Sequence, residues 1–452
     1  MQVIEKVTSG WSRANLCNQK ILLPENINEL VEIIRRNNEK NEKYTIRGGG
    51  QSYFDMATSQ HNKLICLKKL NNIIELNKIE KTITVESGVT VKGLINYLKD
   101  KNYIVSSLPG TVHATIGGII SNNSHGKDTK YGNFSNRVIS LKVILTAGNI
   151  LNVIKGEKLF NYIIGHAGLV CIILEAKIKL IEGYSYSNLI NKKIVIFNNI
   201  NDGIELINNA KDDEYSGIWI DAFSKNYRGL FINGKWSNKK RIVQDISELG
   251  KQYYNINFFF KIYHFFSRIF ICNFIVRLIN NFLFIYTKFF VKKNQLVDFN
   301  SFYFYHNNNF INIRKMFPKG IFEIQLLVKK ENKNQLLEIF KLCKKYKLES
   351  WICGIKKHKK DNFPNSFSIN GYDLTINFPY KKTKSKSFNL FYNELKKYVL
   401  KKDIIFHLAK DSILDKNTFN IMYPNFKELI KIKKELDKKL ILTSDFYNRL
   451  IG

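Results

Sequence analysis

Two glycine-rich turns lie about sixty residues apart in the first third of the chain, and they constrain its fold more than any other feature. The first occupies residues 46–53, with the sequence IRGGGQSY. The second combines LPGT at residues 108–111 with TIGGI at 115–119 and SHGK at 124–127. Because glycine has no side chain, backbone N–H groups in such turns can come within hydrogen-bonding distance of an anion. The pair therefore predicts two turns that close on one large anionic cofactor.

Each turn alone has a second interpretation, because residues 48–50 also suit a strand-to-helix turn and residues 117–118 a close helix contact. The order of the two turns and the strands predicted around them favour a cofactor-binding role for both turns. The dinucleotide fingerprint of the Rossmann fold is absent, since no strand leads straight into Gly-x-Gly-x-x-Gly with an acidic residue about twenty positions later. We therefore expect a dinucleotide-binding fold of another kind. Apolar runs on either side of the turns predict β-strands at residues 43–46, 64–67, 82–86 and 138–145.

The length and charge of the chain limit the number of its domains and the kind of partner it can bind. A length of 452 residues with 44% apolar residues predicts two or three folded domains. Lysine and arginine total 71 against 38 acidic residues, and the formal charge of +33 favours phosphates, nucleic acid or acidic lipid as partners. A composition rich in Lys, Asn, Ile and Phe, typical of an AT-rich genome, accounts for about half of this effect. No zinc-finger spacing or aromatic RNA-binding signature is present, so we expect no nucleic-acid partner.

The cysteines and the N-terminus predict the compartment. Six cysteines, at positions 17, 66, 171, 272, 343 and 353, form no C-x-x-C pair. They predict reduced, buried thiols, and no metal site is expected. Residues 1–6 lack a secretory hydrophobic stretch, so we expect the catalytic domains to stay in the cytoplasm.

A basic, aromatic-rich segment covers residues 258–291, where Phe and Ile are interrupted by Lys261, Arg268, Arg277 and Lys288. A membrane-spanning helix needs about twenty residues almost without charge, and this segment has no such window. Two interpretations are equally supported. The segment either lies at the headgroup boundary of an anionic membrane or forms a helix pair that caps a substrate domain. A transmembrane hairpin is a minor alternative.

Motifs along nearly the whole chain resemble one family. The chain is similar to the flavoproteins of the vanillyl-alcohol oxidase type, which share a PCMH-type FAD-binding domain. Its later motifs resemble in particular the decaprenylphosphoryl-ribose oxidases of that family. The matching motifs are GWSR at 10–13, RGGGQSY at 47–53, LPGT at 108–111, GG at 117–118, HGK at 125–127, GHAGL at 165–169, NFP at 377–379, AKDS at 409–412, MYP at 422–424 and SD at 444–445.

This resemblance implies an α+β fold. Residues 1–185 would form a two-subdomain PCMH-type FAD-binding domain, and residues 186–404 an antiparallel-sheet substrate domain. A basic aromatic, membrane-proximal insertion would lie near residues 251–293 of the substrate domain. Residues 405–452 would return to the FAD domain. Apolar periodicity predicts helices at residues 26–37, 91–101, 335–346 and 387–400.

The resemblance also implies the roles of individual residues. Lys410 matches the family's lysine at the flavin ring, and Tyr53 and His125 match positions beside the flavin, so these three are the predicted catalytic residues. The predicted substrate-binding residues are Lys127, Tyr305, Gln325, Lys356 and Thr375. The predicted FAD-binding residues are Arg47, Gly48, Gly49, Gly50, Gln51, Ser52, Tyr53, Pro109, Gly110, Thr111, Thr115, Gly117, Gly118, Ser121, Asn122, His125, Gly126, Gly168, Ile172, His407 and Lys410.

The chain departs from the family at several of these positions. Many members carry a histidine bonded to the flavin where this chain has Gln51, and a Gln side chain has no comparable nucleophile, so non-covalent FAD is expected. Thr375 stands where mycobacterial-type enzymes have a cysteine. Asp373 replaces an amide, Glu323 a Gln, and His407 a Tyr. The two added carboxylates leave the choice of sugar open.

The resemblance implies an FAD-dependent oxidoreductase that acts on a secondary hydroxyl of a sugar. The expected substrate is a polyprenylphosphoryl-linked pentose, whose ribose 2-hydroxyl becomes a ketone in the first half of epimerisation to arabinose. An NAD(P)H-dependent short-chain reductase would complete that epimerisation, and the protein would be peripheral on the inner face of the plasma membrane. Two alternatives remain: an oxygen-using oxidase of a free sugar, alditol or aldonolactone, and a catalytically inactive membrane-surface protein.

Overall fold

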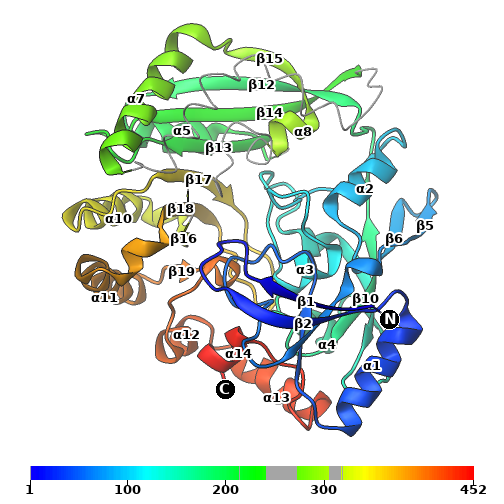
Figure 1. Ribbon diagram of the computed structural model, residues 1–452. Coiled ribbons are helices and arrows are strands. Elements are labelled where there is room, and N and C mark those ends of the chain that lie inside the picture. Colours follow the sequence, from blue (N-terminus) through cyan, green and yellow to red (C-terminus); the bar gives the residue numbers. More distant parts are fainter. Residues whose placement is uncertain (1, 213, 241–271, 305–316, 318) are drawn as a thin grey trace.

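The computed structural model describes residues 2–212, 214–240, 272–304, 317 and 319–452 (Figure 1). A four-stranded and a five-stranded sheet make up the part drawn in blue to cyan-green. An eight-stranded sheet makes up the part drawn in green to orange. The architecture is therefore α+β, as expected, with antiparallel pairing in most of its strands.

The first sheet, in the order β1-β2-β4-β3, holds the first glycine turn directly after β3. β2, β4 and β3 run parallel, and α1 makes the crossover from β2 to β3. Asn26 caps the start of this helix, because its side chain accepts a hydrogen bond from the Glu29 amide at 3.0 Å. The strands predicted at 43–46 and 64–67 are confirmed within one residue. The elements are β1 (Gln2–Thr8), β2 (Cys17–Leu23), α1 (Ile27–Glu39), β3 (Tyr44–Arg47) and β4 (Lys63–Cys66).

The second sheet, in the order β5-β6-β10-β8-β9, is antiparallel and carries the second glycine turn on α3. Gly117 lets this helix pack against the sheet, because a Cβ there would lie 2.8 Å from the Cβ of Ser87. The elements are β5 (Ile73–Asn77), β6 (Thr82–Glu86), α2 (Val91–Leu98), α3 (Ile116–Ser121), β8 (Val138–Ile144), β9 (Ile150–Ile154), α4 (Lys158–Ile163) and β10 (Ile172–Lys179), and β7 (Tyr103–Ile104) pairs with β11 (Ile181–Glu182).

The largest sheet has the order β15-β12-β14-β13-β17-β18-β16-β19. Its central strands are buried on both faces, as β16 shows, where eight of nine consecutive residues are buried, including Glu323 and Gln325. The strands are β12 (Asn188–Phe197), β13 (Tyr215–Ile220), β14 (Gly229–Lys240), β15 (Asn294–Asp298), β16 (Ile321–Lys329), β17 (Ile352–His358), β18 (Gly371–Pro379) and β19 (Ile405–Phe406). The helices beside them are α5 (Ile200–Asn209), α7 (Asn273–Phe290), α8 (Phe299–Tyr303), α10 (Asn334–Lys345) and α11 (Lys386–Lys401).

The C-terminal helices α12 (Lys416–Met422), α13 (Phe426–Leu436) and α14 (Asp445–Leu450) lie beside the N-terminal sheets (Figure 1). The segment before α14 meets β3, where the Tyr44 amide donates to the carbonyl of Ile441 at 2.9 Å. These residues complete the half of the molecule that carries the two glycine turns.

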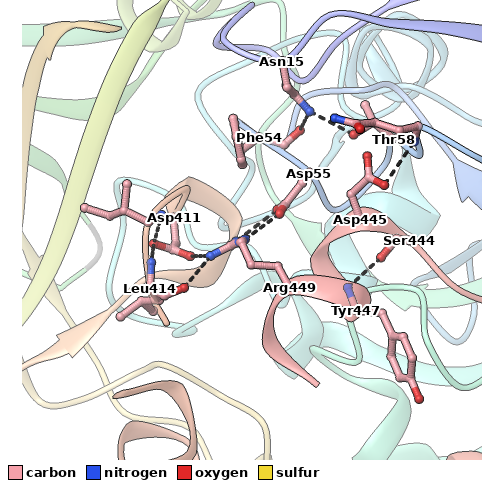
Figure 2. Close-up of polar contacts among 12 residues, drawn as sticks. Asn15, Phe54, Asp55, Thr58, Asp411, Leu414, Ser444, Asp445, Tyr447 and Arg449 are labelled. Atoms are coloured by element: carbon pink, nitrogen blue, oxygen red, sulfur yellow. Dashed lines mark hydrogen bonds and ion pairs between the residues drawn. The ribbon is translucent and has the colours of Figure 1, made fainter. Parts of the chain in front are cut away.

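Arg449 on α14 joins two loops that are far apart in the sequence (Figure 2). Its Nε lies 2.6 Å from Asp55 Oδ2, just after the first glycine turn, and its Nη1 lies 2.9 Å from Asp411 Oδ2. Asp411 directly follows Lys410, so α14 fixes the first turn and the predicted catalytic lysine relative to each other. We call Arg449, Asp55 and Asp411 the arginine clamp.

The cysteines differ from the prediction at one position. Cys17, Cys66, Cys171, Cys343 and Cys353 are buried free thiols, whereas Cys272 is exposed. The prediction of burial is wrong for Cys272 because it is the residue just before α7, at the surface.

Candidate active site

One cavity of about 360 Å³ lies between the glycine turns and the largest sheet. Residues 48–53, 109–111, 114–115 and 118–119 reach it from the N-terminal half, and strands β13, β16, β17 and β18 reach it from the other. A second cavity of about 60 Å³ shares Gly48, Ser52, Thr115, Gly118 and Asn122 with the first and continues behind α3. A volume of a few hundred cubic ångströms is typical of small-molecule sites.

The first turn offers three backbone donors to this cavity. Within the described residues, the amides of Gly50, Gln51 and Ser52 donate to no protein acceptor. Gly50 adopts a left-handed conformation, with φ of +63°, which glycine alone accommodates without strain. Successive free N–H groups in a turn form an anion-binding concavity, so this turn fits a pyrophosphate.

Direct hydrogen bonds connect the two turns. Thr111 Oγ1 donates to Gln51 Oε1 at 2.9 Å, and the Gly49 amide donates to Thr115 Oγ1 at 3.3 Å. Two buried polar atoms at the same place, Ser52 Oγ and Asn122 Oδ1, have no partner among the described residues. Buried polar atoms of this kind normally bond to something, so their position favours a bound polar ligand. The residues of both turns therefore fit a large anionic cofactor.

Lys410 reaches the cavity from the loop that precedes Asp411. Its Nζ lies 3.0 Å from Glu323 Oε1 on β16 and 3.6 Å from the centre of the Tyr53 ring, which in turn packs on Trp11. Burial lowers the pKa of Lys410, and the neighbouring Glu323 carboxylate opposes that shift. The arrangement presents an ammonium group whose proton is held less firmly than on a surface lysine.

His125 lies beside Lys410 in a buried polar cluster. Its Nε2 is 2.9 Å from Gln325 Nε2 and 3.3 Å from Asp373 Oδ2, and Gln325 Nε2 also donates to Asp373 at 2.6 Å. Burial lowers the pKa of His125 well below its ordinary value, and the positive charge of Lys356 adds to the shift. A neutral imidazole can then accept or donate a hydrogen bond at the cavity wall. His407, stacked on Phe367 at 3.8 Å, is kept neutral by burial in the same way, with its pKa well below the ordinary value.

Two further lysines reach the cavity from opposite halves. Lys356 on β17 lies 3.9 Å from Asp373 Oδ2. Lys127, at the end of the second turn, donates to the carbonyl of Tyr303 at 2.5 Å, and its Nζ lies 4.8 Å from the Tyr303 ring centre. Burial lowers the pKa of Lys127 well below its usual range, and Lys356 is the next largest cause. Burial therefore favours the neutral amine of Lys127, whereas an anionic group bound beside Lys127 and Lys356 would favour its charged form.

The structure brings most of the predicted residues together. Arg47 and Gly126 do not line either cavity: Arg47 donates to the carbonyls of Ser9 and Ala57, and Gly126 packs against the backbone of Ser107. Tyr305 lies outside the described residues. The first cavity is lined by Gly48, Gly49, Gly50, Gln51, Ser52, Tyr53, Pro109, Gly110, Thr111, Thr115, Gly118, Asn122, His125, Lys127, Gln325, Lys356, Thr375, His407 and Lys410, and the second also by Gly117, Ser121, Gly168 and Ile172.

Several residues at the site were not predicted. Ser216 and Trp219 on β13 and Ile355 on β17 line the cavity, but alternating strand residues carry no chemical signal in the sequence. Trp11 belongs to the GWSR motif, to which no role was assigned. Glu323 and Asp373 are departures from the family pattern in the sequence, and Lys410 and Gln325 are predicted site residues, but the sequence does not indicate the contacts Glu323–Lys410 and Asp373–Gln325.

Comparison with known proteins identifies the cofactor domain. A family model described as "FAD binding domain" matches residues 19–154, the segment that carries both glycine turns. Residues 19–154 are a PCMH-type FAD-binding domain. FAD is thus the anionic cofactor that the turns fit.

Relatives of this FAD-binding protein share its fold and class of chemistry. The decaprenylphosphoryl-beta-D-ribose oxidase of Mycolicibacterium smegmatis is 25% identical over 98% of this chain and 96% of that protein. The L-gulonolactone oxidase of Mus musculus is 24% identical over 39% of this chain, which spans only 40% of that enzyme. Cholesterol oxidase from Brevibacterium sterolicum has the same fold, with a TM-score of 0.75, 13% identity and coverage of 100% of this chain and 97% of its own. The chain is an FAD-dependent oxidoreductase of the sugar and alcohol oxidase type.

Proposed function

We propose that this flavoprotein oxidises the 2-hydroxyl of a ribose that is linked through phosphate to a polyprenyl chain. The product would be the 2-keto sugar, and an NAD(P)H-dependent short-chain reductase would complete the epimerisation to arabinose. The observation that carries this proposal is one cavity that Lys410 shares with the cofactor turns and with two further lysines, Lys127 and Lys356. Similarity to the mycobacterial ribose oxidase along the whole chain supports the same substrate class.

Each polar residue has a part in the proposed reaction. FAD, when bound, supplies the acceptor for the hydride that leaves the carbinol carbon. Lys410 accepts the hydroxyl proton, because its lowered pKa makes the neutral amine accessible, and Glu323 at 3.0 Å holds its Nζ in the cavity. Lys127 and Lys356 pair with the phosphate, while Gln325 and His125 bond sugar hydroxyls.

We further propose that FAD is held without a covalent bond. Gln51 stands in the first turn, and both ends of its side chain are engaged, since Oε1 accepts from Thr111 and Nε2 donates to the Gly49 carbonyl at 2.9 Å. An amide has no nucleophile comparable to an imidazole nitrogen. Acid precipitation should therefore release all of the flavin into the supernatant, and flavin retained in the pellet would contradict this point.

Anaerobic reduction of the bound flavin tests the substrate. We expect a short-chain prenylphosphoryl ribose to bleach the oxidised-flavin absorbance, and free ribose and L-gulono-1,4-lactone to leave it unchanged. Bleaching by the lactone but not by the lipid-linked sugar would refute the proposal. A Lys356→Gln variant should need a higher concentration of the prenylphosphoryl sugar, because the phosphate loses one cationic partner.

A second candidate is an oxygen-using oxidase of a free sugar, alditol or aldonolactone. The similarity of the FAD part to lactone oxidases and the carboxylates Glu323 and Asp373 favour it, since an acidic wall disfavours a phosphate. This candidate predicts rapid peroxide formation in air with an uncharged sugar. Slow reoxidation by oxygen and fast reoxidation by a quinone would count against it.

A further inference from the structure

Helix α7 presents its more apolar face to solvent. Five large apolar side chains recur every three or four residues along it and are between 43% and 68% exposed. The opposite face is buried, and it includes the polar residues Asn280 and Thr287. A helix of a globular protein normally buries its apolar stripe, so this orientation is reversed. The exposed stripe consists of Phe274, Leu278, Phe282, Ile285 and Phe289.

Polar contacts hold α7 in this orientation. Asn280 Nδ2 donates to Asp221 Oδ1 at 3.2 Å, and Arg228 bonds both Asp221 and Asn281, the latter at 2.7 Å. At the start of the helix, Asn273 Oδ1 accepts from Trp351 at 2.9 Å. A rotation that buried the apolar stripe would break the bonds of Asn280, Asn281 and Asn273, and it would remove one donor from Asp221, which is 2% exposed. The outward orientation of the stripe is therefore a stable property of the fold.

Positive charge accompanies the stripe. Arg277 and Lys288 are exposed and, at 3.6 residues per turn, lie together along one border of it. Lys292 is exposed just beyond the end of the helix. Tyr286 and Phe290, which are 39% and 73% exposed, lie along the other border. None of the helices in the described part of the chain is long and apolar enough to cross a membrane.

We propose that α7 lies in the plane of an anionic lipid surface, with its five apolar side chains among the acyl chains and its cations on the lipid headgroups. A single helix with a projecting apolar stripe and bordering Arg and Lys suits a fluid interface, into which each side chain can sink separately. The charge of the border is complementary to acidic headgroups, and each cation near such a surface strengthens the binding. This contact does not depend on the substrate proposed above.

Vesicle sedimentation with the full-length holoenzyme tests the surface. We expect the protein to bind vesicles of phosphatidylcholine with phosphatidylglycerol and to bind pure phosphatidylcholine vesicles more weakly. Phe282→Glu with Phe289→Glu should weaken binding to the vesicles at least tenfold, because two aromatic side chains no longer enter the acyl chains of the lipid. The matched control is Leu390→Glu with Ile421→Glu, at side chains of similar exposure, 50% and 64%, on other helices, and it should bind like the wild type.

A second test removes the positive charges of Arg277 and Lys288 beside the apolar stripe and leaves the stripe itself unchanged. Arg277→Gln and Lys288→Gln should each reduce binding to anionic vesicles about fivefold and leave binding to neutral vesicles unchanged. These variants serve if the double glutamate variant does not fold, as judged by circular dichroism and bound flavin. Equal binding by wild type and all variants, or no binding by the wild type, would overturn the proposal. So would a change from dimer to monomer on Phe282→Glu in sedimentation velocity, which would assign the stripe to a second copy of the chain.

Discussion

Replacing Arg449 with Met should destabilise the protein through the two carboxylates that it leaves behind. Asp55 and Asp411 are buried, with side chains 5% and 0% exposed, and Arg449 itself is only 22% exposed. The guanidinium makes contacts of 2.6 and 3.1 Å to Asp55 and 2.9 Å to Asp411, and it donates to the Leu414 carbonyl at 2.9 Å. Met keeps most of the volume and removes all four contacts.

The size of the effect follows from the cost of an unpaired buried charge. Removing one partner of a buried ion pair costs about 3–5 kcal/mol. Unfolding entropy is about 2.1 cal/mol/K per residue, which for 452 residues gives roughly 0.95 kcal/mol/K if the chain unfolds as one unit. A loss of about 4 kcal/mol therefore lowers Tm by about 4 °C. If the FAD-side half unfolds on its own, the fall is larger, because fewer residues share the entropy.

Thermal unfolding followed by circular dichroism at pH 7 with excess FAD measures this shift. The triple variant Arg449→Met, Asp55→Asn, Asp411→Asn should recover much of the loss, because no charge remains unpaired. Burial raises the pKa of Asp55 and Arg449 opposes that rise, so removing Arg449 raises it further above the unfolded value. The folded state then binds a proton more readily than the unfolded state, and the Tm deficit should shrink as pH falls toward 4. A Tm within 1 °C of wild type, or a triple variant as unstable as the single one, would refute the reasoning.

Three further predictions concern the cavity and its supports. Gly49→Ala should weaken FAD binding at least tenfold in a fluorescence titration, because the new Cβ would lie 2.1 Å from the His113 carbonyl; Gly93→Ala, whose nearest neighbour is 3.5 Å away, should have no effect. Lys410→Met should slow substrate-dependent flavin reduction by about 10²–10⁴-fold in stopped-flow experiments while FAD stays bound, and an unchanged rate would remove Lys410 from the reaction. Burial lowers the pKa of His166 to about 3, below its unfolded value of about 6.5. Its contribution to the free energy of unfolding is therefore present above pH 6.5 and falls by about 1.4 kcal/mol per pH unit as pH falls toward 3. The free energy of unfolding of His166→Gln, measured in urea at several pH values, should lack this slope.

The strands and turns around the cofactor could be predicted because their signals are local. The strand at Thr82–Glu86 is confirmed as predicted, and the helices predicted at 91–101, 335–346 and 387–400 are confirmed with ends that differ by one to three residues. Hydrophobic periodicity and glycine runs depend only on neighbouring residues. The pairing of two turns in one cavity followed from the need of one cofactor for both.

Long-range side-chain contacts could not be predicted. Nothing near Arg449 in the sequence indicates that it meets Asp55, and Glu323 and Lys410 come together only because β16 and the loop after β19 are neighbours. For residues 258–291 the sequence left two interpretations open. Its second half forms α7, with an exposed apolar stripe, whereas residues 258–271 lie outside the described part.

The arginine clamp has a consequence for how the protein is made. Asp55 and Arg449 are 394 positions apart, and closing a loop of that length carries an entropic cost of roughly 5 kcal/mol. One ion pair cannot offset this cost, so the clamp closes only after the sheets on both sides have brought the two segments together. We therefore expect the loop that holds Lys410 to reach its final position late in folding. In a newly made chain, the residues around the glycine turns would then pack before the loop with Lys410 completes the cavity. The chain would become able to oxidise a substrate only at the end of folding.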